Sequence, residues 1–465
     1  MNKKTGIKIL TLLASLFLVT SCTTTCECVC NGNGGGGGNS NSDSGGGGGG
    51  GSDSGDQTGV RIIDPSTYSG NEITLRLWQG FSDADGKAIK SLVDSFNAEY
   101  RGCIKIENQM YAWDVLFRKL GLAADDPSTA PHMVFAASDR AVDMVYQDIF
   151  LPMNDAESVL GVTATDYLTS AWDAGTYGLG DRYSLPLDVH PVALYYNKDI
   201  VSESQVPETW DEFLSICQTL TGGSVYGWTI PNVYSITKDV FYSMLVQNGG
   251  DILDENENII FANNTAVNTL QTLYDWKYGK EGSKAISPTT VNNGGDETLF
   301  TTGYSAFYFD LPAHINTFND KFPDLHYGIA PLPESTGEFG TSVAGTHQMA
   351  MIKCSVTNNT LKSAAYTFMK YVEDHEEVWA QGGNVPAKKS VLTSPQIQTI
   401  SNYQYLKPFI DMAYTSTAGH THYRYSYIVY NQMGVAVAEA LNKTKSVRDA
   451  LTYYAGVAAR KIAEG

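Results

Sequence analysis

Two periods of apolar and polar residues recur along the chain from residue 70 onward. Short alternating runs predict strands, and longer runs with apolar residues three and four positions apart predict helices. The predicted elements are a strand at 73–78, a loop at 80–86, a helix at 88–100, a strand at 103–106, a helix at 113–122 and a strand at 133–135. Strands that alternate with helices predict a parallel sheet in an α/β lobe. Ligands bind at the carboxyl ends of such strands, here 78–83 and 135–140.

Local signals in the middle of the chain mark helix boundaries. Thr209 and Glu212 have the spacing of a capping box, and Trp210 is expected to pack beneath the first helical turn. Asn248-Gly249-Gly250 predicts a helix end that turns into a strand. We interpret Tyr195-Tyr196-Asn197 as structural.

The first 21 residues have the pattern of a secretory signal. Basic residues Lys3, Lys4 and Lys8 accompany an apolar run over 7–19, which is too short to span a bilayer comfortably. Ser21-Cys22 closes this segment and resembles a bacterial lipobox. We therefore expect residues 1–21 to be removed and Cys22 to be acylated, which anchors the chain to a lipid bilayer. The alternatives are an ordinary signal peptide with a chance cysteine, or a transmembrane anchor.

Residues 22–60 are expected to form a tether behind the anchor. This segment is dominated by Gly, Ser, Asn and Asp, a composition that buries almost no apolar surface. Its Cys26, Cys28 and Cys30 alternate, but no nearby His or further Cys completes a tetrahedral metal site. The remaining cysteines are predicted to be buried small hydrophobes without a disulfide framework; they are Cys103, Cys217 and Cys354.

The net charge of the chain is −19, and the predicted signal carries three lysines and no acidic residue, so the mature chain is more acidic still. Strong acidity argues against nucleic acid and anionic lipid surfaces as partners. The 28 tyrosines offer flat apolar faces with a hydroxyl, which suit polar ligands with C–H patches such as sugars, although core and surface packing accounts for most of them.

Short motifs recur in a fixed order between residues 195 and 387 of the chain. They are Tyr195-Tyr196-Asn197-Lys198, Pro207-Glu208-Thr209-Trp210-Asp211-Glu212, Tyr226-Gly227-Trp228, Gly249-Gly250-Asp251-Ile252-Leu253, Gly303-Tyr304-Ser305-Ala306-Phe307, Tyr327-Gly328-Ile329-Ala330-Pro331-Leu332-Pro333 and Gly383-Asn384-Val385-Pro386-Ala387. In order and spacing the chain resembles the family 1 extracellular solute-binding proteins, which include the maltose-binding proteins and serve ABC importers.

The resemblance implies a two-lobed α/β fold of the periplasmic-binding-protein type II, or Venus flytrap, with discontinuous lobes and a cleft between them. Lobe one would take residues 70–190 and 346–410, and lobe two would take 191–345 and 411–465. Hinge closure around a ligand would follow. A monomeric receptor on the periplasmic or extracellular side of a membrane, working with the transmembrane subunits of an ABC permease, is implied as well.

The same resemblance implies where a ligand would be bound. In the maltose branch, polar contacts follow the third strand, here Ser138-Asp139-Arg140; Asp139 accepts two sugar hydroxyls or, alternatively, caps the next helix. His190 stands at an acidic cleft position, Tyr234 where that branch stacks a sugar, and Asp310 in the loop where it places a Trp. Contacts are also expected from the end of the first strand and from the second and third crossovers; these are Gln79, Asp83, Gly345, Thr346, Tyr423, Arg424 and Tyr425.

The leading interpretation is a membrane-tethered receptor that captures a mono- or oligosaccharide for import. A receptor for a glycerol phosphodiester is the alternative with the same fold, and it would need the cations Arg140, His190 and Arg424 in the cleft. A surface glycan-binding adhesin and a glycoside hydrolase are the alternatives of another class. The sequence contains no zinc signature, nucleophile elbow or phosphate loop, so we expect no enzyme, cofactor or metal.

Overall fold

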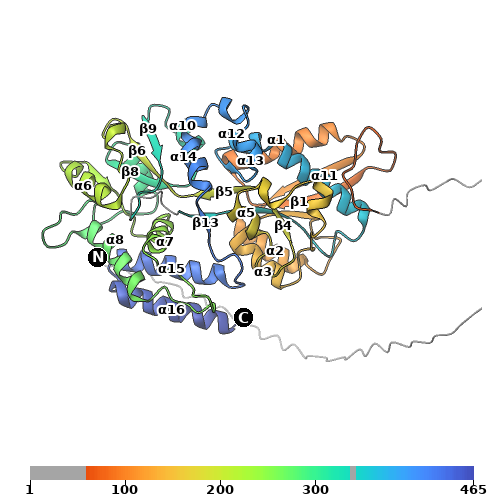
Figure 1. The fold of residues 1–465 in the computed structure, drawn as a ribbon. Helices are drawn as coiled ribbons and strands as arrows, with labels where there is room; N and C mark the ends of the chain where they lie inside the picture. Colours follow the sequence, from red (N-terminus) through yellow and green to blue (C-terminus); the bar gives the residue numbers. More distant parts are fainter. Residues whose placement is uncertain (1–58, 336–341, 465) are drawn as a thin grey trace, which may run out of the picture. The chain divides into compact units, whose positions relative to one another are not determined.

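The computed structural model describes residues 59–335 and 342–464. The predicted signal peptide, Cys22 and the tether up to residue 58 lie outside the described residues, as do Cys26, Cys28 and Cys30. The described part is a mixed α/β structure built on three sheets (Figure 1). None of its helices is both long and apolar enough to cross a bilayer.

The first sheet contains the strands predicted near the start of the folded part. Its order is β2-β1-β3-β11-β4, and its strands are β1 (Ile73–Gln79), β2 (Ile104–Met110), β3 (Met133–Ala137), β4 (Ser184–Pro186) and β11 (His347–Met351). Strands β1, β2 and β3 are parallel, with Ile73 opposite Ile104 and Leu77 opposite Met133. Strand β11 runs antiparallel to both β3 and β4. A parallel core is confirmed, and the chain returns to it much later through an antiparallel strand.

The second sheet is formed by the middle of the chain. Its order is β7-β8-β6-β9, and its strands are β6 (Ala193–Asn197), β7 (Tyr226–Trp228), β8 (Ser305–Asp310) and β9 (Tyr327–Ala330). Strand β6 is central, pairs antiparallel with β8 and β9, and is buried along its whole length. Tyr195 is fully buried and donates a hydrogen bond of 2.8 Å to the carbonyl of Leu311. This confirms the structural role predicted for Tyr195-Tyr196-Asn197.

A third, small sheet, the connecting sheet, lies where the chain passes between the other two. Its order is β12-β5-β10-β13, and its strands are β5 (Asp188–Pro191), β10 (Val343–Gly345), β12 (Val385–Pro386) and β13 (Thr417–Ala418). Strand β5 links β4 of the first sheet to β6 of the second, and β10 precedes β11 of the first sheet. Residues far apart in sequence are brought together here, since Gly345 pairs with His190. The lobe boundaries proposed from the sequence stay a prediction.

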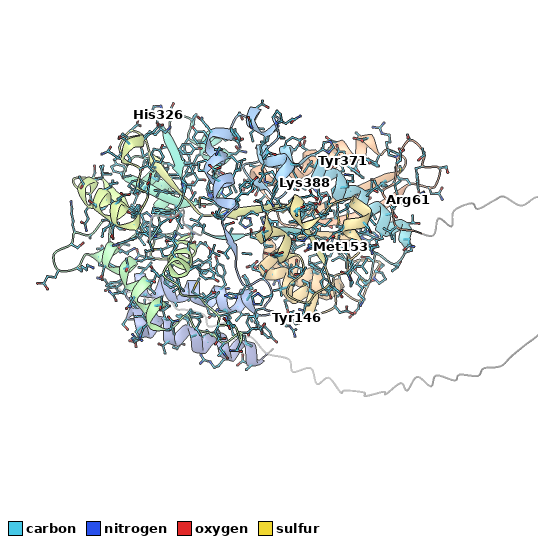
Figure 2. The ribbon with its side chains drawn as sticks, in the orientation of Figure 1. Arg61, Tyr146, Met153, His326, Tyr371 and Lys388 are labelled. Carbon is cyan, nitrogen blue, oxygen red and sulfur yellow. The ribbon has the colours of Figure 1, made fainter. Side chains whose placement is uncertain are left out.

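Helices pack around the sheets, and side chains fill the space between them (Figure 2). The helices are α1 (Asp83–Glu99), α2 (Trp113–Ala123), α3 (Ser138–Tyr146), α4 (Ala156–Leu160), α5 (Thr169–Ala174), α6 (Trp210–Leu220), α7 (Thr237–Gln247), α8 (Asn264–Tyr278), α9 (Gly295–Thr301), α10 (His314–Lys321), α11 (Asn359–Asp374), α12 (Glu376–Gln381), α13 (Lys389–Leu392), α14 (Tyr403–Ala413), α15 (Ser426–Leu441) and α16 (Val447–Glu464). Short 3-10 helices cover Ala164–Asp166, Glu203–Gln205 and Ile397–Thr399.

The boundary signals of α6 and α7 are confirmed. Thr209 caps α6 by accepting a bond of 3.2 Å from the backbone N–H of Glu212, whose carboxylate accepts from the backbone of Thr209. Trp210 is buried beneath that turn, and its indole donates to Gln247 at 2.7 Å. Helix α7 ends at Gln247, and Gly249 takes the positive φ of 72° that a helix end favours.

Two local predictions were wrong. Helix α1 begins at Asp83, within the predicted loop, because acidic Asp83 and Asp85 favour a helix N-terminus despite Gly86. No strand follows Gly250: the Asp251 carboxylate accepts from the backbone of Ile252, and Leu253 forms only an isolated bridge with Ile259. The three cysteines of the described part are free; Cys103 and Cys217 are buried as predicted, but Cys354 is partly exposed, so the predicted burial of Cys354 was also wrong.

Candidate ligand-binding site

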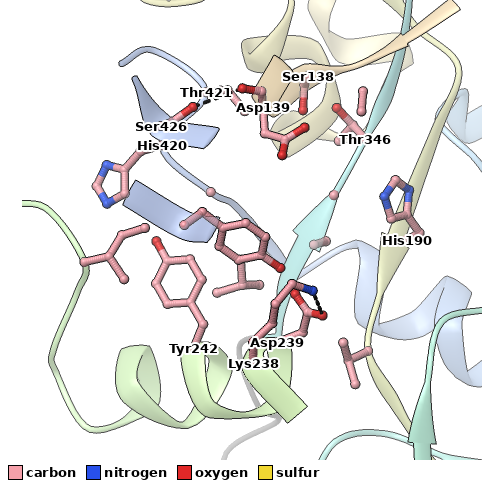
Figure 3. A pocket seen from close by; sticks show the side chains of 18 of the residues that line it. Ser138, Asp139, His190, Lys238, Asp239, Tyr242, Thr346, His420, Thr421 and Ser426 are labelled. Carbon is pink, nitrogen blue, oxygen red and sulfur yellow. Dashed lines mark hydrogen bonds and ion pairs between the residues drawn. The ribbon is translucent and has the colours of Figure 1, made fainter. Parts of the chain in front are cut away.

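A cavity of about 270 Å³ opens between α3, the connecting sheet, α7 and the segment before α15 (Figure 3). Its polar and aromatic lining residues are Ser138, Asp139, His190, Lys238, Asp239, Tyr242, Thr346, His420, Thr421, Ser426 and Tyr430. Segments around both large sheets contribute, because α3 follows β3 of the first sheet and α7 follows β7 of the second. The cavity therefore lies where the chain crosses between the sheets.

Asp139 is the most available acceptor in the cavity. It lies in the first turn of α3 directly after β3, and Ala137, not Asp139, occupies the N-cap position. Burial raises the pKa of Asp139, against the attraction of Arg140, His190 and Lys238. Its carboxylate has no side-chain hydrogen-bond partner among the described residues, while its backbone carbonyl accepts from the Ser426 hydroxyl at 3.2 Å. Apart from a contact with the backbone of Arg140, the carboxylate is left to accept from a ligand.

Lys238 and Asp239 form an ion pair on the opposite wall (Figure 3). The Lys238 ammonium lies 2.6 Å from the Asp239 carboxylate at the start of α7. Burial lowers the pKa of Lys238, but Asp239 outweighs it and the net pKa is raised; burial also raises the pKa of Asp239. The pair supplies donors and acceptors to the cavity while its own charges nearly cancel.

Tyr242 and Tyr430 form an aromatic wall with ring centroids 6.2 Å apart. The Tyr242 hydroxyl donates to the Asp251 carboxylate at 2.9 Å, and His420 bonds the same carboxylate oxygen at 2.7 Å. Burial alone would raise the pKa of Asp251, but the His420 contact outweighs it and the pKa is lowered. Because these polar tips are already bonded within the protein, the ring of Tyr242 is held in place and presents an apolar surface.

The connecting sheet supplies the remaining wall. Thr346 is buried and its hydroxyl accepts a bond of 3.0 Å from Gln348, while its carbonyl accepts from the backbone of Ser138 at 3.0 Å. Gly345 is required beside His190, since a Cβ there would lie 2.1 Å from the ring Nε2. The glycine therefore lets an imidazole reach the cavity.

A profile of the bacterial extracellular solute-binding proteins matches residues 91–404, which is more than half of the chain. The chain belongs to this family. Members of the family bind solutes, so this solute-binding protein is not an enzyme.

Relatives and solved structures agree with that family. The chain is 26% identical over 359 residues to the arabinooligosaccharide-binding protein of Halalkalibacterium halodurans, a match covering 72% of this chain and 74% of the relative. It is 24% identical over 346 residues to the galactooligosaccharide-binding protein of Bacillus subtilis, covering 71% and 76%. The sugar-binding protein MalE from Xanthomonas citri superposes with a TM-score of 0.70 at 20% identity, covering 84% of this chain and 98% of MalE. That structural likeness shows the two-lobed periplasmic-binding-protein fold.

Five of the residues predicted for the site of this solute-binding protein line the cavity; they are Ser138, Asp139, His190, Gly345 and Thr346. Gln79 is 2% exposed, and its side chain is bonded to the backbone of Phe81 and to Asn108. Asp83 lies exposed at the start of α1. Asp310 is buried, where it accepts from the Tyr308 hydroxyl and the Leu311 backbone and pairs with His314 at 3.0 Å.

The predicted arginines and outer tyrosines also lie outside the lining. Arg140 pairs with Asp114 at 3.0 Å and its guanidinium lies 4.0 Å from the ring centre of Tyr427. Arg424 pairs with Asp143 at 3.1 Å. Tyr234 is 43% exposed beside Lys238, whose ammonium lies 5.1 Å from the centre of its ring. Tyr423 and Tyr425 pack edge to face with centroids 5.8 Å apart, in a turn before α15.

The sequence interpretation missed Lys238, Asp239, Tyr242, His420 and Tyr430, which all line the cavity. One signal was available: Asp239 and Tyr242 are three positions apart, so they lie on one face of the helix that follows β7. His420 and Tyr430 carry no such signal, because their positions depend on how the third crossover folds.

Proposed function

We propose that this protein captures a neutral carbohydrate and delivers it to an ABC importer. The observation that carries the proposal is the Asp139 carboxylate, which is buried without a side-chain partner and faces a cavity walled by Tyr242 and Tyr430. A carboxylate accepts hydrogen bonds from vicinal hydroxyls, and tyrosine rings contact the C–H faces of a sugar. The names of the oligosaccharide-binding relatives support the same ligand class.

The charges of the cavity argue against a phosphorylated ligand. Asp139 and Asp239 bring two carboxylates, and Lys238 is already paired with Asp239. Of the three cations that a glycerol phosphodiester would need, Arg140 and Arg424 are engaged with Asp114 and Asp143 outside the lining. The third, His190, lines the cavity but lies 3.4 Å from the Asp188 carboxylate. An anion would therefore meet uncompensated acidic charge, whereas a neutral ligand would not.

A thermal-shift screen of mono- and oligosaccharides, polyols and glycerol phosphodiesters tests the ligand class, followed by calorimetry on the best compound. A carbohydrate should raise the melting temperature by mass action. Asp139→Asn should weaken its binding roughly tenfold or more, since a hydrogen bond to a charged group contributes about 1.5–3 kcal/mol. Asp94→Asn is the control, because Asp94 is exposed and pairs with Lys90 within α1. Stabilisation only by phosphodiesters, with Asp139→Asn binding them more tightly, contradicts the proposal.

We also propose that Cys22 carries the acyl anchor and that residues up to about 60 tether the receptor beside its permease at the cell envelope. The basic, apolar and Ser21-Cys22 pattern supports this. Labelled fatty acid should be incorporated into the full chain in a bacterial host, and Cys22→Ala should abolish incorporation and release the protein from membranes. Cys26→Ala is the matched control and should stay labelled. An unlabelled wild type is the contrary result.

A further inference from the structure

Asp188, His190 and His347 come together beside the sugar cavity although they stem from two distant segments. Asp188 and His190 are two positions apart on β5, so their side chains share one face of the strand. His347 is the first residue of β11. Carboxylate and imidazole atoms of these three residues all lie within 4.8 Å of one another.

The separations approach those of a metal coordination sphere. His347 Nδ1 lies 2.8 Å from one Asp188 oxygen, and His190 Nδ1 lies 3.4 Å from the other. Bonds of 2.0–2.2 Å in a tetrahedral zinc site place neighbouring ligand atoms about 3.3 Å apart. Only small side-chain shifts would therefore bring the three groups around one ion.

Each of the three groups is held by a further contact. The Asp188 carboxylate accepts from the backbone N–H of His347 at 2.8 Å and from the indole of Trp379 at 3.1 Å. The His347 ring stacks on Trp113 with centroids 5.4 Å apart. Outer contacts of this kind fix the orientation of metal ligands.

His190 provides the observation that points to a missing partner. Its Nδ1 is buried and makes no well-aligned hydrogen bond among the described residues, and the nearest Asp188 oxygen lies 3.4 Å away. Its Nε2 lies against Gly345, in the space that a side chain there would fill. A buried ring nitrogen without a partner is costly, and a cation held jointly with Asp188 and His347 would satisfy it.

We propose that Asp188, His190 and His347 bind a divalent transition-metal ion. Two imidazoles and one carboxylate favour Zn²⁺ and its neighbours over Mg²⁺ and Ca²⁺, which prefer oxygen ligands. Because His190 lines the sugar cavity, a remaining coordination position would be taken by water or by a ligand oxygen. The ion would also join β5 to β11, two segments at which the chain crosses between the sheets. The evidence for this site does not rest on the proposed carbohydrate function.

Calorimetry with Zn²⁺, and with Mg²⁺ in parallel, tests the site on the full chain after chelator treatment and without a histidine tag. Cys26, Cys28 and Cys30 are changed to Ser throughout, because thiolates bind zinc themselves. One equivalent of Zn²⁺ should bind and raise the melting temperature. His190→Asn should weaken binding at least tenfold, as even the loss of an outer contact costs about 10–100-fold. His326→Gln is the control, since exposed His326 pairs with Asp199 at 3.1 Å near the edge of the molecule (Figure 2).

Two calorimetric results would overturn the metal site. The site is overturned if the serine variant binds no Zn²⁺, or if it binds Zn²⁺ equally well with and without His190→Asn. X-ray absorption of the zinc-loaded serine variant gives a second measurement if His190→Asn folds poorly: two imidazole ligands support the site, and sulfur scattering or a shell without imidazole overturns it. Carbohydrate binding is measured separately, so its failure leaves the metal result unaffected.

Discussion

At the residue scale, the polar groups of the cavity differ in whether they are already hydrogen-bonded within the protein or remain available to a ligand. Asp251 accepts from both Tyr242 and His420, so the polar ends of these two side chains are already bonded within the protein. Asp139 has no such partner from another side chain in the described part. Recognition is therefore expected to depend on the Asp139 carboxylate for hydrogen bonds and on the tyrosine rings for apolar contact.

Substitution at Tyr242 separates these two contributions. Tyr242→Phe removes the bond to Asp251 but keeps the ring, so we expect a stability loss of about 0.5–1.5 kcal/mol and carbohydrate affinity within a few-fold of wild type. Tyr242→Ala removes the ring and should weaken binding about tenfold or more. Denaturation and calorimetry on both variants check this. Equal affinity losses in the two variants would show that the hydroxyl, not the ring, contacts the ligand.

At the element scale, helix boundaries follow from capping chemistry that the local sequence contains. In α6, the Thr209 hydroxyl satisfies the N–H of Glu212, and Glu212 returns the bond to the backbone of Thr209. Helix α7 supplies Lys238, Asp239 and Tyr242 to the cavity, and it ends two residues before Gly249, which takes a positive φ. Lys238, Asp239 and Tyr242 share the first two turns of α7 because the helix starts at Thr237.

Thr209→Ala tests the capping box. Loss of an N-cap side chain costs about 0.5–2 kcal/mol, so the free energy of unfolding should fall by roughly 1 kcal/mol. Thr219→Ala in the same helix is the matched control: its hydroxyl donates to the Ser215 carbonyl one turn earlier, and alanine has a higher helix propensity than threonine. Chemical denaturation of both variants provides the measurement. A control that loses as much stability as Thr209→Ala would contradict the capping account.

At the scale of the whole folded part, side-chain contacts join α3 to α15 and to the segment that leads into it, beside the cavity. Asp143 on α3 pairs with Arg424, and Arg140 on α3 lies over the ring of Tyr427 on α15. Helix α3 follows the first sheet, whereas α15 packs against α7, α8 and α16 beside the second. If the protein closes on a ligand as proposed, these contacts would contribute to the stability of the closed arrangement.

Ligand closure should be visible in solution. Saturating carbohydrate is expected to reduce the radius of gyration measured by small-angle scattering. Arg424→Ala should weaken binding by no more than about fivefold, since exposed ion pairs contribute roughly 0.2–1 kcal/mol. Lys407→Ala is the control because its pair with Asp411 lies within α14. A far larger loss at Arg424 with strong salt dependence would instead indicate direct contact with an anionic ligand.

The sequence by itself determined the elements whose signals are local. Periodicity predicted β1, α2 and β3, and the Thr209–Glu212 spacing predicted the start of α6. Ordered motifs determined the family, because many weak local signals in a fixed order are specific together. Local reasoning failed where a signal was ambiguous, as at the start of α1 and after Gly250.

Only the tertiary structure decided which of the polar residues meet. Gly345 pairs with His190 across more than 150 residues, and that register brings His347 to Asp188. Arg140 and Arg424 were predicted to bind ligand, but in the structure they pair with Asp114 and Asp143. These partners are far away in sequence, so no local pattern could have predicted the pairs. Strand pairing and helix packing set these positions, since they depend on contacts between residues far apart in sequence, whereas capping and periodicity act within a few residues.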